Sequence, residues 1–142
     1  MADAWNYLEL EGLITERLAA CGVTARVLSA ADLAGVDEAS QITPALHVIY
    51  DGDKIVEMSA YGSARVAQGW LVVVAVRNAR DQRTGTAARS EAGPLAQQVL
   101  GALMGWEPSP RWGACKRTNG PKPLFTAGFF YLPLRFEMEV VL

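Results

Sequence analysis

The end of the chain carries a pattern that fits a β-strand and little else. Over residues 132–142 apolar side chains occupy every second position, and Arg135, Glu137 and Glu139 lie between them. Because successive side chains of a strand point to opposite faces, this period of two predicts a strand with one face in a core. The charged second face is either solvated or part of an interface. Pro133 lacks an N–H for the ladder, so it marks an edge position, a bulge or the first residue of the strand.

A second segment, residues 69–77, is apolar on both faces. Its run from Trp70 to Val76 holds no charged side chain. Such strands are typical of the centre of a sheet, where both faces are covered. A helix can cover one face, and the other can pack against a second subunit.

Two further segments have the spacing of helices with one buried face. The first is expected over residues 4–21, with Asp3 as its cap and Gly22 at its end. Its apolar stripe consists of Tyr7, Leu10, Ile14, Leu18 and Cys21. The second is expected over residues 87–106, with a break or kink at Gly93-Pro94.

Short extended segments complete the pattern. Residues 25–29 favour a short strand. Residues 45–50 and 54–61 favour two strands joined by a turn at Asp51-Gly52, a dipeptide typical of hairpins. Residues 30–44 have the composition of a surface loop. Residues 107–123 form a long connection with room for a short strand at 114–118.

These elements do not alternate as they do in a chain of βαβ units. Their order predicts an α+β fold, an antiparallel or mixed sheet of about four to five strands with two main helices packed on one face. The 142 residues are 51% hydrophobic, which is enough for one domain, residues 1–142, with a packed core.

Charge and composition argue against several classes of protein. With 13 Lys and Arg against 15 Asp and Glu, the formal charge is −2, which does not suit a protein that coats nucleic acid or an anionic membrane. The longest apolar run is far shorter than the about 20 residues that a membrane span needs. The acidic N-terminus predicts no secretory signal. Cys21 and Cys115 are too far apart in sequence for a metal-ligand pair and indicate a reduced, intracellular setting.

Few residues offer catalytic chemistry. Glu137 and Glu139 share a strand face at about 6.5 to 7 Å, which fits a carboxylate pair for glycoside hydrolysis, but Arg135 on that face favours a charge stripe. His47, the only histidine, lies among apolar residues and has no motif partner. Phosphate-binding glycine loops, nucleophile elbows and zinc-binding helix motifs are absent from the sequence. We therefore predict no catalytic, cofactor-binding or metal-binding residues.

Positive charge gathers in two polar segments. The first contains Arg77, Arg80, Arg83 and Arg89, and the second contains Arg111, Lys116, Arg117 and Lys122. Arginines in loops meet phosphates or the carboxylates of a partner chain. Trp106 and Trp112 accompany the second segment, and Arg and Trp are enriched at interface anchors. Contacts with other protein chains are therefore the expected role of these segments.

Residues 92–142 combine two short motifs, AGPLAQQVLGALMGWEPSP and GPKPLFTAGFFYLPLRFEMEVVL. With them the chain resembles the C-terminal half of the tail terminator proteins of long-tailed bacteriophages. The N-terminal half agrees in layout, with an opening helix, the strand PALHVIY and a long apolar strand that ends in Arg77 and Asn78. The matching residues are Val99, Ala102, Leu103, Gly105, Trp106, Pro108, Pro121, Pro123, Phe125, Tyr131, Pro133, Leu134 and Phe136.

The resemblance implies a structural protein without catalysis or cofactor. Members of this family form a ring, usually hexameric, that docks on the head-proximal end of the tail tube and stops its growth. The opposite surface of the ring meets neck or head-completion proteins. For this chain the resemblance implies a homo-oligomer in the virion tail, assembled in the host cytoplasm, with no membrane association.

A closed ring needs heterologous contacts, in which one face of a subunit meets a different face of its neighbour. We predict such contacts at the charged stripe of Arg135, Glu137 and Glu139 and at the strand that contains Trp70. The arginine loop is predicted to face the lumen or the tube, with at most weak, non-specific contact to DNA. It carries Arg77, Arg80, Arg83 and Arg89.

Two alternatives stay open at this point. The chain could be another phage neck component, such as a head-to-tail connector. It could also be a small ligand-binding or hydrolytic domain that uses Glu137 and Glu139, with His47 as a further candidate.

Overall fold

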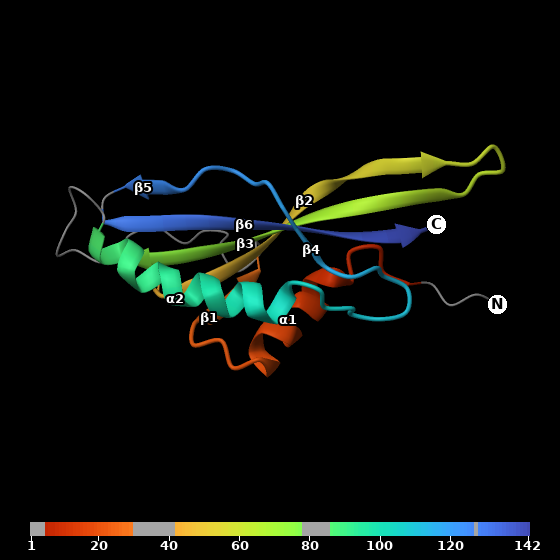
Figure 1. The fold of residues 1–142 in the computed structure, drawn as a ribbon. Helices are drawn as coiled ribbons and strands as arrows, with labels where there is room; N and C mark the ends of the chain where they lie inside the picture. The colour runs from red at the N-terminus through yellow and green to blue at the C-terminus, as the bar shows by residue number, and fades with distance from the viewer. Residues whose placement is uncertain (1–4, 30–41, 78–85, 127) are drawn as a thin grey trace.

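The computed structural model describes residues 5–29, 42–77, 86–126 and 128–142. Within these ranges the chain forms two helices and six strands (Figure 1). The predicted cap Asp3, most of the predicted loop 30–44, and Arg80 and Arg83 lie outside the described residues. In chain order the elements are α1 (Leu10–Ala20), β1 (Arg26–Ser29), β2 (Ala45–Met58), β3 (Ala64–Arg77), α2 (Thr86–Leu103), β4 (Lys116–Thr118), β5 (Leu124–Thr126) and β6 (Phe129–Val141).

The six strands make one mixed sheet. Its order is β1-β2-β3-β6-β4, and β5 also pairs with β6. β1 runs parallel to β2, whereas the other pairs are antiparallel. The predicted α+β fold with a mixed sheet is therefore confirmed. β5 goes beyond the prediction because three residues are too few to show a period.

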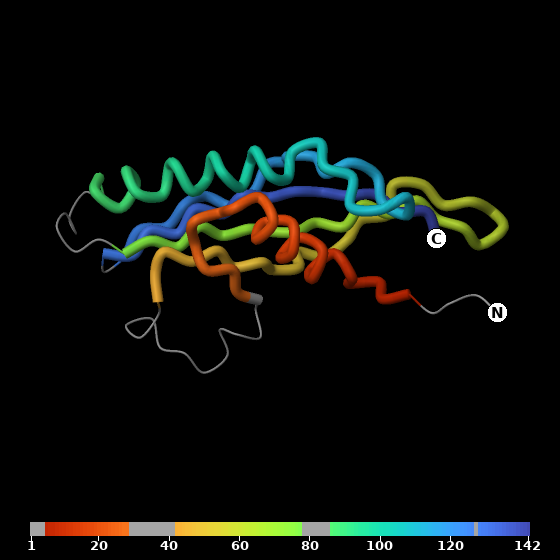
Figure 2. The backbone as a smooth tube through the Cα atoms, turned by 90° about the horizontal axis from the view of Figure 1, so that it is seen from below, coloured from red at the N-terminus to blue at the C-terminus, as the bar shows by residue number. Residues whose placement is uncertain are grey.

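Both helices cover the same face of the sheet, as predicted (Figures 1 and 2). The α1 side chains that enter the core are Leu10, Ile14 and Leu18, which confirms three of the five residues of the predicted stripe. Tyr7 lies in a turn before α1 and is half-buried, since the helix begins at Leu10 and not at residue 4. Cys21 is exposed instead, because α1 ends before it and Gly22 turns the chain with a φ of 70°. The large buried side chains of β3 and β6 on the covered face are Trp70, Val72, Val74, Leu134, Phe136 and Met138.

The hairpin turn predicted at Asp51-Gly52 is wrong. β2 continues through these two residues, which form a β-bulge opposite the single residue Gly69 of β3. Gly52 has a φ of 84°, a conformation that glycine adopts without strain and that serves a bulge as well as a turn. The turn of the hairpin lies at residues 59–63, between β2 and β3. Both strands are therefore longer than predicted.

A break or a kink was predicted at Gly93-Pro94; a break is wrong, since α2 continues through Pro94. A proline inside a helix removes one backbone hydrogen bond. Here the helix is held by a row of buried side chains around that point, among them Ala92, Leu95 and Val99. Packing against the sheet thus outweighs the local preference.

The terminal strand confirms the prediction from its alternation. Buried residues recur at every second position from Leu134 to Val140 along β6. On the outer side of β6, β4 pairs with residues 135–137 and β5 with residues 129–131. Pro133 lies in the gap between these two short strands, which is the edge position named among its possible roles.

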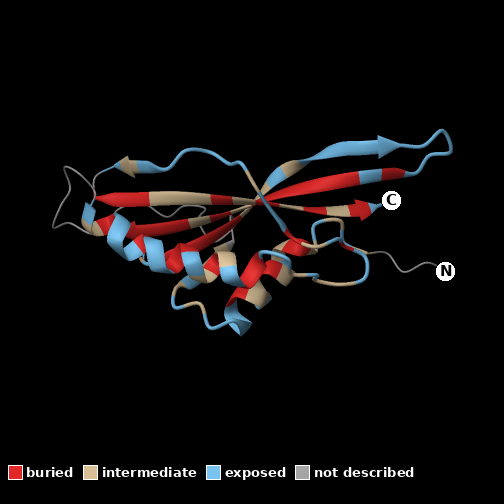
Figure 3. Cartoon of the chain, in the orientation of Figure 1, coloured by how far each residue is buried: buried red, intermediate tan, exposed pale blue. Residues whose placement is uncertain are grey.

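The end of β2 and the beginning of β3 extend past the helices as a hairpin (Figure 3). β2 is buried over its first four residues and exposed from Asp53 to its end. We call residues 53–65 the hairpin arm. It projects at the end of the molecule where the C-terminus also lies (Figure 1).

Candidate assembly surface

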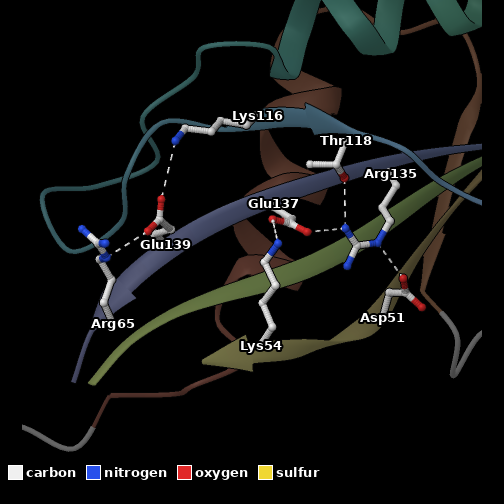
Figure 4. Close-up of polar contacts among 8 residues, drawn as sticks. All are labelled: Asp51, Lys54, Arg65, Lys116, Thr118, Arg135, Glu137 and Glu139. Carbon is white, nitrogen blue, oxygen red and sulfur yellow. Dashed lines mark hydrogen bonds and ion pairs between the residues drawn. The ribbon is translucent and has the colours of Figure 1, made fainter. Parts of the chain in front are cut away.

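Arg135 is the centre of a cluster of ion pairs on the sheet face opposite the helices (Figure 4). Its Nε donates to Oδ2 of Asp51 at 2.7 Å. Its Nη1 donates to Oε2 of Glu137 at 2.5 Å and to the hydroxyl of Thr118 at 3.0 Å. One side chain of β6 thereby joins the bulge of β2 and the short strand β4.

Two glycines make room for Arg135. A Cβ on Gly69 would overlap Nη2 of Arg135, and one on Gly120 would lie 2.9 Å from the Cβ of Arg135. The guanidinium therefore crosses β3 over Gly69 on its way to Asp51. The bulge and Gly69 lie opposite each other in the register. Together they form the binding site of the Arg135 side chain, which we call its seat.

Two glutamates extend the cluster along β6. Glu137 also lies 3.3 Å from Nζ of Lys54. Glu139 lies between Nε of Arg65 at 3.3 Å and Nζ of Lys116 at 3.5 Å. We call this cluster the ionic face; it consists of Asp51, Lys54, Arg65, Lys116, Arg135, Glu137 and Glu139. The predicted stripe of Arg135, Glu137 and Glu139 does share one face, and its charges are paired within the subunit.

The pKa of Glu137 does not suit the proton donor of a glycosidase. The hydrogen bond from Arg135 holds the pKa of Glu137 below its ordinary value. Hydrogen bonds to Asp51 and Glu137 raise the pKa of Arg135. The proton donor of a glycosidase needs the opposite, a carboxyl group with a raised pKa. An open hollow of about 290 Å³ does lie between the two glutamates, Lys54 and Lys116, but these four side chains form ion pairs with one another.

The structure does not bring His47 to these glutamates. His47 pairs with Val73, which in turn pairs with Pro133. Pro133 is four positions before Glu137 on β6, or about 13 Å along the strand. His47 is 3% exposed, and burial lowers its pKa. It belongs to the interior of the sheet.

Trp70, predicted at an interface, lies inside the subunit. Its side chain is 0% exposed. Its ring centroid is 5.0 Å from that of Tyr50, and its indole N–H donates to Oε1 of Gln68 at 3.1 Å. Another chain has no access to this side chain in the folded subunit, so Trp70 is not among the interface residues proposed below. On the other face of β3, Leu71 and Val73 are only half-buried.

Arg77 and Arg89 lie at the end of the molecule opposite the hairpin arm. Both are exposed. The guanidinium of Arg77 lies 5.1 Å from the centroid of the Phe129 ring, and Nη2 of Arg89 donates to the hydroxyl of Thr86 at 3.2 Å. Their contact with a tube or with DNA stays a prediction.

The described part of the chain shows no metal-binding group and no membrane-spanning helix. Among residues 5–29, 42–77, 86–126 and 128–142, no three His, Cys, Asp or Glu side chains are grouped so that they could hold a metal ion. In the same ranges, neither helix has the length and apolarity to cross a bilayer. Burial raises the pKa of the Cys115 thiol to about 12, so this cysteine does not supply a thiolate at neutral pH.

A comparison with protein families identifies the chain. The family model described as "Phage tail terminator protein" matches residues 4–142. The chain belongs to the phage tail terminator family. It is therefore a structural protein of a phage tail, as the resemblance of its two motifs implied.

A solved structure shares the fold of this tail terminator family member. It is a chain of the "Virion of native gene transfer agent (GTA) particle", with 18% sequence identity and a TM-score of 0.58. The match covers 96% of this chain and 99% of the other. No curated protein sequence matches significantly.

One surface of this family member was missed by sequence reasoning. The hairpin arm exposes Ile55 by 60%, Met58 by 64% and Tyr61 by 98%. The signal is present in the segment IVEMSAY, where apolar residues sit beside a polar turn. The sequence analysis predicts a separate strand over residues 54–61, because it places the turn at Asp51-Gly52.

Proposed function

We propose that copies of this chain form a closed ring, a hexamer, that caps the head-proximal end of a phage tail tube. The ring ends polymerisation of the tube and presents its other surface to neck or head-completion proteins. The whole chain acts as one domain, in the virion tail after assembly in the host cytoplasm. The observation that carries the proposal is the match of residues 4–142 to the tail terminator family.

The two edges of the sheet support a head-to-tail arrangement. Beyond Val48, the outer edge of β2 has no strand partner among the described residues. The opposite edge carries the short strands β4 and β5. An open strand edge is a template for another chain. Because the two edges differ, their contact is heterologous, which is the kind that closes a ring.

The charged residues have separate places in this proposal. The tube or the lumen meets the end of the subunit that carries Arg77 and Arg89. Arg80 and Arg83, which lie between them in sequence, belong to the same proposed contact. Any contact with DNA there is weak and non-specific. The ionic face enters the interface as a preformed surface. Since Arg135, Glu137 and Glu139 are already paired within the subunit, its shape is fixed before assembly.

Electron microscopy of tails assembled with and without this protein tests the proposal. With the protein, tails should have one uniform length, and without it the tubes should continue to grow and vary in length. Identical length distributions would refute the terminator function. If tails assembled without the protein have a uniform length but do not join heads, the chain is a head-to-tail connector instead.

A further inference from the structure

A short segment near the N-terminus lies against the root of the hairpin arm. Residues 5–9 precede α1 and form no helix or strand. They lie on the helix side of the sheet, at the end of the molecule where the arm projects (Figure 1). The segment is nevertheless tied to this end of the molecule by specific contacts of Tyr7 and Glu9.

Tyr7 contacts both strands at the root of the arm. Its hydroxyl donates to Oδ2 of Asp53 on β2 at 2.6 Å. Its carbonyl oxygen accepts from Nε2 of Gln68 on β3 at 2.7 Å. Asp53 and Gln68 lie opposite each other in the register, and they are the first pair beyond the bulge. One residue outside the sheet therefore holds β2 and β3 at the level where the arm begins.

Burial makes the contact with Gln68 a necessary one. Gln68 is 0% exposed, and its Oε1 accepts from the indole N–H of Trp70 at 3.1 Å. A buried amide group without a hydrogen-bond partner destabilises a fold. The carbonyl of Tyr7 supplies a partner for Nε2, so the folded core itself fixes the place of the segment.

The segment has a second attachment at Trp112, beside the last residues of β6. Oε1 of Glu9 accepts from the indole N–H of Trp112 at 2.7 Å, and Trp112 forms a single bridge to Val140 of β6. The Trp5 ring lies edge-on to Trp112, with centroids 6.0 Å apart. The guanidinium of Arg111 lies 4.3 Å from the centroid of Trp5. The segment thus reaches β2, β3 and, through Trp112, β6.

The bulge at the root of the arm determines the direction in which β2 leaves the sheet. A β-bulge bends a strand and increases its twist. The bulge of residues 51–52 is held from both faces. Arg135 binds Asp51 on the face opposite the helices, and Tyr7 binds Asp53 on the helix face. Because these contacts flank the bend, together they set its angle.

We infer that residues 5–9 are a strap that fixes the direction of the hairpin arm, with Tyr7 as the positioning residue. The strap is a property of the single subunit and does not depend on the proposed ring. In that ring, an arm held in one direction before assembly loses less conformational entropy on contact than a mobile one. The strap therefore prepares the arm before any other chain is present.

Distances between two spin labels test the direction of the arm. The labels are attached at Tyr61→Cys, on the tip of the arm, and at Gln97→Cys, on the exposed side of α2. Cys21→Ser removes the exposed native thiol, whereas the buried Cys115 stays in place. The labelled full chain should give a narrow distribution of distances. The further replacement Tyr7→Phe, which removes only a hydroxyl, should broaden or shift this distribution.

The acceptor of the Tyr7 hydroxyl gives a matched set of variants. Asp53→Asn keeps an oxygen that accepts this hydrogen bond and should keep the native distribution, whereas Asp53→Ala should match Tyr7→Phe. The double variant should be no broader than either single variant, because both remove the same contact. As a control, Tyr131→Phe removes a tyrosine hydroxyl from β6 at the opposite end of the molecule and should leave the distribution unchanged.

Hydrogen–deuterium exchange along β2 separates positioning from a general loss of stability. In Tyr7→Phe the protected amides of residues 53–58 should exchange about fivefold faster, the effect of one lost hydrogen bond. Those of residues 45–50, before the bulge, should be unchanged. Unchanged distances in Tyr7→Phe, or equally faster exchange in both segments, would overturn the inference. Either result leaves the terminator function standing, since that function is tested by tail length.

Discussion

Replacing Gly69 by alanine should destabilise this protein, although alanine is normally the better residue in a strand. The new methyl group would occupy the space of Nη2 of Arg135. The guanidinium would have to leave Asp51, Glu137 and Thr118, the three groups to which it donates. Gly69 is not among the glycines with a positive φ, so the backbone itself accepts alanine.

The size of the effect follows from the contacts that are lost. The bond to the sheltered Glu137 is worth roughly 1.5–3 kcal/mol, as hydrogen bonds to charged groups are. The pair with Asp51, whose side chain is 41% exposed, adds no more than about 1 kcal/mol. Against these losses stands a gain of roughly 0.5–1 kcal/mol for alanine over glycine in a strand. The free energy of unfolding should therefore fall by about 1–3 kcal/mol.

Urea unfolding of a double-mutant cycle isolates the cause. In an Arg135→Ala background the methyl group at position 69 meets no guanidinium, so Gly69→Ala should be neutral or stabilising there. The coupling between the two positions should be about 2–3 kcal/mol, in the range seen for side chains in direct contact. An equal loss in both backgrounds would show that the backbone at Gly69, and not the seat of Arg135, requires glycine.

Three further predictions concern single side chains. In the native protein Cys21 should react with a maleimide, whereas Cys115, whose pKa burial raises to about 12, should react only on unfolding; equal rates would contradict its burial. Burial lowers the pKa of His47, so the unfolded chain takes up the proton first, and stability should fall as the pH drops below about 6.5; His47→Gln should flatten that part of the profile, and an unchanged slope would assign it to other groups. The hydrogen bond from Arg135 lowers the pKa of Glu137. Its stabilising contribution should be complete above the ordinary glutamate pKa of about 4.3 and be lost as the pH falls further, a loss that Glu137→Gln should not show.

Local periodicity accounts for the parts of the fold that could be predicted. The alternation along β6 and the apolar run in β3 each lie within one segment, and burial follows them. The stripe of Leu10, Ile14 and Leu18 predicts the buried face of α1 for the same reason. In each case the signal and the structure involve the same few residues, so no knowledge of distant partners is required.

The bulge at Asp51-Gly52 shows where local reasoning fails. A glycine with positive φ after an aspartate serves a two-residue turn and a bulge equally well. The choice between them depends on the strand that lies opposite. Here Gly69 of β3 lies opposite the two residues, and Arg135 donates a hydrogen bond to Asp51. With the turn placed there, Ile55 and Met58 belong to a separate strand over residues 54–61, and the hairpin arm is not predicted.

The ionic face could be predicted only in part. The period of two places Arg135, Glu137 and Glu139 on one face of β6. Their partners lie on β2, β3 and β4, and only the register between strands brings them within reach. Trp70 is the converse case, since a strand that is apolar on both faces gives no sign of which face the helices cover.

Electron cryomicroscopy of the head-proximal end of assembled tails tests the central claim most directly. The account predicts a single closed ring of copies of this chain at that end, with neighbouring sheets in contact through opposite edges. Copies distributed along the tube, or a tail end that lacks the chain, would contradict it.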